Sequence, residues 1–264
     1  MIKIGILIPS TNRGLNCKDY RSIPFYRIFL KHFIKTYAKN KYAYKFYLVV
    51  DRDDPIYSRM SEMSQLKKFI SMLSNVSISF IKSDGIEKGH VTQMWNRAFE
   101  VAYREGCDYF YQCGDDICIM DKGWETVFIN LLGKLQNLGV VGPFDWGRHL
   151  YDIENNVKQK FLLTQSFVSR THYEIFGFYF DPRIKNWFCD DWITYVYGEI
   201  GRMLHVKELR IMNMGGDPRY TPVGDGDQWS KVANECKQYI KEGNSKIHEF
   251  VKRFNEQVVK ANAQ

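Results

Sequence analysis

The chain has 264 residues, of which 45% are hydrophobic, 25% charged and 16% aromatic. This balance excludes an intrinsically disordered chain, and a content of seven prolines and nineteen glycines excludes collagen-like and proline-rich low-complexity architectures. The formal net charge is +7, but Lys and Arg are spread along the chain among thirty acidic residues, which argues against a nucleic-acid-binding protein. A basic balance also suits an enzyme whose substrate carries phosphates, or a protein that works near an anionic membrane surface.

The six cysteines form no CxxC pair and no Cys/His zinc spacing, so we expect reduced thiols. No window approaches the ~20 apolar residues that a membrane span needs. The N-terminal run MIKIGILIPS is too short for the apolar region of a signal peptide. We therefore expect a soluble, cytoplasmic protein.

Strands and helices alternate in the first half of the chain. Short apolar runs predict strands, and apolar residues at helical spacing predict the helices between them. The expected strands cover residues 3–8, 44–50, 76–81 and 109–113, and the expected helices cover 23–37, 61–73 and 92–103. This alternation predicts an α/β protein with a Rossmann-like, doubly wound, mostly parallel central sheet.

The second half is less regular. The predicted helices cover residues 123–135, 170–176 and 191–198, and the predicted strands cover 139–143, 161–168 and 209–214. Residues 145–160 are polar and aperiodic, which predicts a mobile loop, and residues 215–226 form a Gly/Asp/Pro-rich loop. From Trp229 onward the pattern predicts a basic helix that is broken near Gly243.

Polar residues follow four of the predicted strands: 10–13, 51–54, Asp84 and 115–116. In an open α/β sheet, ligands bind beyond the carboxyl ends of the strands. Any one of these clusters is typical of a polar turn. Their joint placement at one edge indicates a binding site.

The sequence Gly114-Asp115-Asp116 follows a fully apolar strand and precedes another apolar run. Adjacent carboxylates repel each other unless a cation or a network of donors offsets their charge. Hard oxygen ligands of this kind suit Mg²⁺ or Mn²⁺, which also bind substrate phosphates. The alternative is a strand-end turn whose aspartates cap the next helix. We favour the metal site.

A second acidic pair lies in Trp187-Phe188-Cys189-Asp190-Asp191-Trp192 at the start of a predicted helix. One interpretation makes Asp190 a helix cap and Asp191 a first-turn charge that the helix dipole favours. The other makes one of the two a general base beside an aromatic wall that could stack against a sugar. The local sequence does not separate these two interpretations.

The order of these segments resembles that of nucleotide-sugar glycosyltransferases with the GT-A fold, in the family 2-like group. The opening IGILIPSTNRG resembles the family's first strand and turn, and LVVDRDD resembles the strand end that contacts the base. The stretch KGHVTQMWNRAFEVAYREGCDYFYQCGDDICI resembles the segment that leads to a DxD-type motif. The stretch FLLTQSFVSRTHYEIFGFYFDPRIKNWFCDDW resembles the acceptor-side segment with its acidic pair and Trp. The resemblance covers residues 1–216 in order.

This resemblance implies roles for individual residues. Asp116 would contact a Mn²⁺ or Mg²⁺ ion, and Asp115 would face the sugar or the ribose. Asp191 would be the catalytic base, with Asp190 as its acidic neighbour. The residues along the bound nucleotide would be Pro9, Ser10, Thr11, Arg13, Asp51 or Asp53, Asp84 and Lys88.

The sequence departs from the family pattern at two positions. Gly114 stands where the usual triplet has its first Asp, so one carboxylate is missing. Asn213 stands at about the place where many relatives have a metal-binding His, and an Asn carbonyl is a weaker, neutral ligand. We therefore expect low metal affinity, with the diphosphate supplying much of the coordination. His205 is nearby in the sequence, and we assign it to an ordinary turn.

The resemblance also implies a domain organisation. We expect a GT-A glycosyltransferase domain over residues 1–227, with a nucleotide-binding half at 1–120 and a smaller acceptor-side half at 121–227. A basic helical extension over 228–264 would follow, and it could make a peripheral contact with a membrane.

The expected function is metal-dependent transfer of a sugar from a nucleotide diphosphate sugar, with UDP as the expected nucleotide, to a hydroxyl of a glycan or glycoconjugate. A base in line with the leaving group implies inversion, but the sequence does not show on which face Asp191 lies, so retention stays open. One alternative is a nucleotidyltransferase that makes sugar nucleotides, although STNRGLNCKDYR lacks the density of glycines typical of such enzymes. The other is an inert carbohydrate- or partner-binding module on the same fold.

Overall fold

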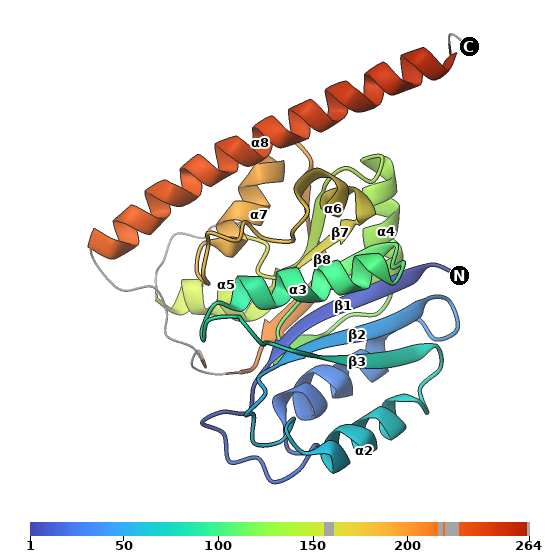
Figure 1. Cartoon of the computed structure of the whole chain (residues 1–264), viewed down its shortest axis with the longest axis vertical. Helices are drawn as coiled ribbons and strands as arrows, with labels where there is room; N and C mark the ends of the chain where they lie inside the picture. The colour runs from blue at the N-terminus through green and yellow to red at the C-terminus, as the bar shows by residue number, and fades with distance from the viewer. Residues whose placement is uncertain (156–160, 216–218, 220–226, 263–264) are drawn as a thin grey trace.

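The computed structural model describes residues 1–155, 161–215, 219 and 227–262. The described strands form one eight-stranded sheet in the order β3-β2-β1-β4-β7-β6-β8-β5 (Figure 1). The strands are β1 (Lys3–Ser10), β2 (Ala43–Val50), β3 (Val76–Lys82), β4 (Tyr109–Gln112), β5 (Ile117–Ile119), β6 (Val140–Asp145), β7 (Ser166–Ser169) and β8 (Met203–Asn213).

Most of these strands run in the same direction. β1 pairs in parallel with β2 and β4, β2 pairs in parallel with β3, and β6 pairs in parallel with β8. β7 lies antiparallel between β4 and β6, and β5 is antiparallel to β8. The carboxyl ends of β1, β2, β3, β4, β6 and β8 therefore meet at one edge of the sheet. This topology confirms the mostly parallel α/β sheet that the sequence predicts.

Helices cover both faces of the sheet. They are η1 (Phe25–Leu30, a π-helix), α1 (Lys31–Thr36), α2 (Met60–Ile70), α3 (Val91–Arg104), α4 (Trp124–Lys134), α5 (Trp146–Glu154), α6 (Arg170–Phe176), α7 (Cys189–Gly198) and α8 (Asp227–Asn262). In Figure 1, α8 crosses over α7 at one end of the molecule and α2 lies at the other end.

The two faces of the sheet carry separate hydrophobic clusters. Along β1, Ile4, Ile6 and Ile8 face the cluster that η1, α1, α2 and α4 complete. Leu7 points the other way, into the cluster that α3, α6, α7 and α8 complete. Since neighbouring side chains of a strand point to opposite faces, a run of consecutive apolar residues is what a strand buried on both faces requires.

The segment that was expected to be a mobile loop is helical in part. α5 covers Trp146–Glu154, and its N-cap Asp145 accepts a hydrogen bond from the backbone N of Arg148 at 3.1 Å. Apolar spacing does not predict this helix, because its apolar residues Tyr151 and Ile153 are about 60% exposed while Asp152 is buried. The prediction of a loop over 145–160 is therefore wrong for the helical residues, and 156–160 lie outside the described residues.

Two other boundaries differ from the prediction. Of the strand expected over 161–168, only the end is confirmed, as β7. β8 begins at Met203, before the predicted start at 209, and it contains His205, which pairs with Gly142. The assignment of His205 to a turn is therefore wrong. Of the predicted loop over 215–226, the structure describes only Gly215 and Arg219.

Helix α8 is continuous through Gly243, so the predicted break there is wrong. A Cβ at Gly243 would lie 2.5 Å from Cγ2 of Val196 in α7, which means that the glycine permits a close approach of the two helices. Cys236, Ile240 and Ile247 of α8 are buried in the cluster shared with α7. The division of the chain at residue 227 stays a prediction, although its position matches the start of this helix.

None of the helices in the described part of the chain is both long and apolar enough to cross a lipid bilayer. The buried side chains of α8 face the protein core, and nothing in the structure supports the expected membrane contact of this helix. All six cysteines lie in the described part and are free thiols, as the sequence predicts.

Candidate functional site

A buried polar chain connects β1 with the turn after β4. Ser10 Oγ donates a hydrogen bond to Oδ2 of Asp115 at 2.5 Å and lies 2.8 Å from the hydroxyl of Tyr57. Because the single hydroxyl proton of Ser10 goes to Asp115, the Tyr57 hydroxyl donates to Ser10. Asp115 is only 1% exposed, so these bonds fix its carboxylate at the carboxyl edge of the sheet.

Arg219 contacts both carboxylates of the pair that follows β4. Its Nη1 donates to the backbone carbonyl of Thr11 at 2.6 Å and to Oδ2 of Asp115 at 3.1 Å. Its Nη2 donates to Oδ1 of Asp115 and, at 3.1 Å, to Oδ2 of Asp116. Burial works against the charge on Arg219, but the two carboxylates more than offset it and raise the pKa of the guanidinium. The positive charge that offsets the repulsion between Asp115 and Asp116 is therefore that of Arg219.

The Asp116 side chain lies between two glycines. A Cβ at Gly114 would lie 2.6 Å from Oδ1 of Asp116, and a Cβ at Gly215 would overlap Oδ2. Burial raises the pKa of Asp116 to about 6, the neighbouring Asp115 adds to this rise, and Arg219 opposes it. This packing gives a physical reason for Gly114, because any larger residue there would displace the Asp116 carboxylate.

Asn213 lies at the end of β8, next to this pair. The backbone N of Met214 donates to the carbonyl of Asp116 at 3.0 Å, so the fold brings the two predicted metal ligands close together. The Oδ1 of Asn213, however, accepts a hydrogen bond from the backbone N of Gly215 at 2.8 Å. Across the described ranges, no group of three or more His, Cys, Asp or Glu side chains is arranged to hold a metal ion. With Arg219 bonded to both carboxylates, this arrangement does not fit a divalent cation.

A second charged group lies on the loops after β1, β2 and β3. Arg13 lies 3.2 Å from Asp51 and 2.9 Å from Asp53, and Lys88 lies 3.8 Å from Asp53. Asp51 also accepts a hydrogen bond from Ser83 at 2.7 Å. The structure thus brings together four of the residues expected along the nucleotide.

The remaining predicted nucleotide residues have other contacts, although Thr11 Oγ1 also accepts a hydrogen bond from the backbone N of Arg13 at 3.3 Å. Asp84 forms an exposed pair with Arg52 at 2.5 Å, and this hydrogen bond lowers the pKa of Asp84. Pro9 lies inside β1, where it pairs with Val49 of β2. Thr11 contributes its carbonyl to the bond with Arg219.

Asp54 is fully buried, and sequence reasoning did not single it out. Its carboxylate accepts hydrogen bonds from the backbone N of Asn12 at 2.6 Å and from those of Ile56 and Tyr57 at 2.9 Å. It therefore fixes the loop after β1 against the loop after β2, and we regard its role as structural.

The second acidic pair occupies the first turn of α7. The N-cap Phe188 has a positive φ of 72°, which few residues other than glycine adopt and which sets the direction of the helix start. Burial raises the pKa of Asp190 to about 7; a hydrogen bond from the Cys189 thiol and the charge of Arg148 oppose the rise, and Asp191 adds to it. A carboxylate of this kind can accept a proton near neutral pH.

The two acidic pairs lie at the same edge of the sheet. Arg148, whose charge acts on Asp190, belongs to the first turn of α5. That turn packs against the end of β8, because a Cβ at Gly147 would lie 3.7 Å from the backbone N of Asn213. Met214, which follows Asn213, donates a backbone hydrogen bond to the carbonyl of Asp116. Helix α5 therefore links the two acidic pairs.

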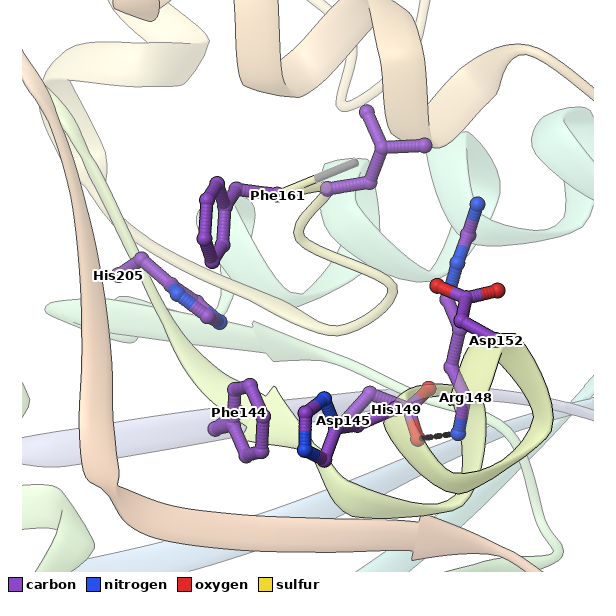
Figure 2. A pocket seen from close by; sticks show the side chains of 8 residues that line it. Phe144, Asp145, Arg148, His149, Asp152, Phe161 and His205 are labelled. Atoms are coloured by element: carbon purple, nitrogen blue, oxygen red, sulfur yellow. Dashed lines mark hydrogen bonds between the residues drawn. The ribbon is translucent and has the colours of Figure 1, made fainter. Parts of the chain in front are cut away.

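A pocket opens between β6, α5 and β8, and one of its lining residues is Arg148, whose charge acts on Asp190. Its lining residues are Phe144, Asp145, Arg148, His149, Asp152, Phe161, Leu162 and His205. Figure 2 shows the rings of Phe144 and Phe161 on either side of His205, and the ring centroids lie 5.5 and 5.9 Å from that of His205. The Nδ1 of His205 is buried and has no hydrogen-bond partner within the part of the chain that is described.

Trp146, Arg148, His149 and Gln165 lie in or beside the segment that the sequence predicts as a mobile loop. Arg148 and His149 instead lie on the helix that lines the pocket, and Gln165 is buried.

An aromatic cluster lies beside the second acidic pair. Trp229 of α8 packs with its ring centroid 5.0 Å from that of Trp187 and 4.6 Å from that of Phe188. Both tryptophans are more than a third exposed. The aromatic wall expected from the sequence around Asp190 therefore includes a residue from the C-terminal helix, which that sequence pattern did not reveal.

Arg219 is the functional candidate that sequence reasoning missed most clearly. It is the one basic residue between Gly215 and Gly226. A single cation in a Gly/Asp/Pro loop that follows a strand of the sheet is a signal that could have indicated it.

Comparison with models of protein families finds no match to this sequence, and comparison with curated proteins finds none either. The chain is similar to solved structures of S. aureus TarS. Two crystal structures of TarS residues 1–349, one of them in complex with UDP, match with a TM-score of 0.52 and 13% sequence identity, over 80% of this chain and 60% of that one. A longer TarS crystal structure matches with a TM-score of 0.54 and 11% identity, over 96% of this chain.

These matches show the fold, which is the GT-A type of α/β fold expected from the sequence. This chain spans 60% of the length of the shorter TarS structures and 43% of the longer one.

Proposed function

We propose that the protein is a glycosyltransferase that moves a sugar from a nucleotide diphosphate sugar, with UDP as its nucleotide, to a hydroxyl of a glycan. The observation that carries this proposal is the acidic pair Asp115–Asp116 at the carboxyl edge of the sheet, together with a second pair, Asp190–Asp191, whose Asp190 is within reach of the charge of Arg148 in α5. The fold likeness to a TarS structure in complex with UDP supports the choice of nucleotide.

The donor would lie along the loops after β1, β2 and β4. Arg13, Asp51 and Asp53 form a polar group that can bind the base and the ribose. The diphosphate would lie towards Ser10 and Arg219, whose half-buried guanidinium supplies positive charge there. Positive charge at this position stabilises the negative charge that develops on a departing diphosphate.

The acceptor hydroxyl would be deprotonated by the second acidic pair. The resemblance assigns this role to Asp191, and the raised pKa of Asp190 suits a proton acceptor near pH 7. The acceptor would enter the pocket lined by Phe144, Phe161 and His205, where the rings can stack on a sugar face. The unpartnered Nδ1 of His205 can bond to one of its hydroxyl groups.

Attack from the side of this base, opposite the leaving diphosphate, implies inversion at the anomeric carbon. The stereochemistry can be read directly by NMR, which distinguishes the anomeric configuration of the first product from that of the donor.

The test compares nucleotide binding with sugar transfer. Asp191→Asn and Asp190→Asn should each be measured for UDP binding by thermal shift and for UDP release from UDP-sugars. Loss of the general base lowers the rate by roughly 10²–10⁴-fold while leaving donor binding intact. If both variants, and the double variant, release UDP at the wild-type rate, the base is not in this pair.

A further inference from the structure

The guanidinium of Arg219 donates hydrogen bonds to both carboxylates of the first acidic pair and to a backbone carbonyl of the loop after β1. Among the described residues, the four Nη hydrogens are directed at the Thr11 carbonyl, at both oxygens of Asp115 and at one oxygen of Asp116. The side chain is 18% exposed, and those of Asp115 and Asp116 are 1% and 15% exposed. A fork of parallel donors on a buried carboxylate is the geometry for which arginine is best suited.

The same residues make a poor site for a divalent ion. Gly114 supplies no oxygen from a side chain, and the amide oxygen of Asn213 is already bonded to the backbone N of Gly215. A hard cation such as Mg²⁺ requires about six oxygen ligands in near-octahedral geometry. Arg219 occupies both carboxylates that could contribute, so a metal would first have to displace it.

The contacts of Arg219 are unequal. Asp115 holds the guanidinium with both oxygens, and Thr11 holds it from the β1 side, whereas Asp116 makes one bond at 3.1 Å. Exchange of that one bond for a phosphate oxygen would leave Arg219 anchored by Asp115. One Nη2 hydrogen would then be directed at the diphosphate of a donor.

We propose that Arg219, anchored by Asp115, is the cation that binds the donor diphosphate, and that this binding needs no divalent metal ion. The inference rests on the proposed function, since it presupposes a nucleotide diphosphate donor. It reverses the expected importance of the two aspartates: Asp115 becomes essential for nucleotide binding, and Asp116 becomes dispensable for it.

The experiment measures UDP binding to the full chain by calorimetry, once in EDTA and once in Mn²⁺. The wild-type affinity should be the same in both. Arg219→Ala should weaken binding in EDTA by about 10- to 100-fold, the usual effect of losing a hydrogen bond to a charged group. Arg219→Lys keeps the positive charge but lacks the forked pair of donors, so its affinity for UDP should lie between those of the wild type and Arg219→Ala. Arg210→Ala removes an exposed arginine paired with Asp121 and should leave UDP binding unchanged.

The aspartate variants and a metal-only arm separate this inference from the metal hypothesis. Asp115→Asn should weaken UDP binding as strongly as Arg219→Ala, and Asp116→Asn should not. Mn²⁺ alone, followed by electron paramagnetic resonance, should not bind the wild type and should bind better to Arg219→Ala, whose carboxylates are released.

Two results would overturn the inference. One is UDP binding by the wild type that requires Mn²⁺, and the other is UDP binding by Arg219→Ala that is undiminished in EDTA. The first result would make Arg219 only a cap over a metal site, and the second would show that Arg219 does not bind the diphosphate. Either result would leave the proposed function standing. If neither UDP nor another nucleoside diphosphate binds the wild type with or without Mn²⁺, the proposed function itself fails, and this inference with it.

Discussion

Asp190 should reduce the stability of the folded protein near and above neutral pH. Its pKa is raised from 3.8 to about 7, chiefly by burial, so the folded state disfavours its ionised form. Between these two pH values the unfolded chain releases a proton that the folded chain retains, and the free energy of unfolding falls as the pH rises. Asp190→Asn removes this titration and should stabilise the protein at alkaline pH.

The size of the effect follows from the two pKa values. Each pH unit between them is worth about 1.4 kcal/mol, so the full cost above pH 7 is about 4 kcal/mol. Part of this cost is already present at pH 5, and the stabilisation by Asp190→Asn should therefore be larger at pH 8 than at pH 5 by about 2–3 kcal/mol. For a protein of this size, that difference corresponds to about 4–12 °C in melting temperature.

The assay is thermal or urea unfolding of the wild type and Asp190→Asn at pH 5 and pH 8. Asp121→Asn is a matched control of opposite sign, because a hydrogen bond from Arg210 lowers the pKa of Asp121. Asp121→Asn should destabilise the protein by a similar amount at pH 5 and pH 8, because a carboxylate whose pKa lies below 3.8 is ionised throughout this range. An Asp190→Asn variant whose stability relative to the wild type is the same at pH 5 and pH 8 would refute the reasoning about burial.

Two further predictions concern the helices around the site. A Cβ at Gly243 would lie 2.5 Å from Val196, so Gly243→Ala should destabilise the protein by about 1–3 kcal/mol in urea unfolding, whereas Gly133→Ala in α4, which has open space, should stabilise it by up to ~1 kcal/mol. Equal effects of the two substitutions would argue against close packing of α7 on α8. Arg148→Gln removes a charge that lowers the pKa of Asp190, so the acidic limb of the pH–rate profile for UDP release should move to higher pH. An unmoved or lowered limb would contradict the placement of Arg148 beside the base.

The elements of the first half could be predicted because each is specified locally. Consecutive apolar residues in β1 report burial on both faces, and the four-residue spacing of Phe25, Phe29 and Phe33 reports one helix face. In the structure these rings lie 5.7 and 6.0 Å apart, in line along the helix. Such patterns can be recognised in the sequence without any knowledge of the tertiary fold.

The elements that were missed depend on tertiary contacts. α5 buries Asp152 and exposes Tyr151, because the side of the helix that carries Arg148 and Asp152 lines a pocket rather than the core. Gly243 looks like a helix breaker in the sequence, but it is required by the approach of α7. A local pattern carries no information on which neighbour an element will meet.

The acidic residues of the candidate site could be predicted from the sequence, but the basic residue Arg219 could not. Asp115, Asp116, Asp190 and Asp191 occur in pairs after strands or at a helix start, which is a visible signal in the sequence. Arg219 is separated from Asp116 by about one hundred residues, and its role depends on contacts that only the folded chain creates. For the same reason, the expectation of a metal ion rested on the acids alone.

Nucleotide release from a panel of nucleotide sugars tests the central claim most directly. The full chain should release UDP from at least one UDP-sugar, as followed by mass spectrometry, and the Asp190→Asn, Asp191→Asn double variant should lose this activity. Absence of UDP release from every donor, together with release of pyrophosphate from a nucleoside triphosphate and a sugar 1-phosphate, would contradict it.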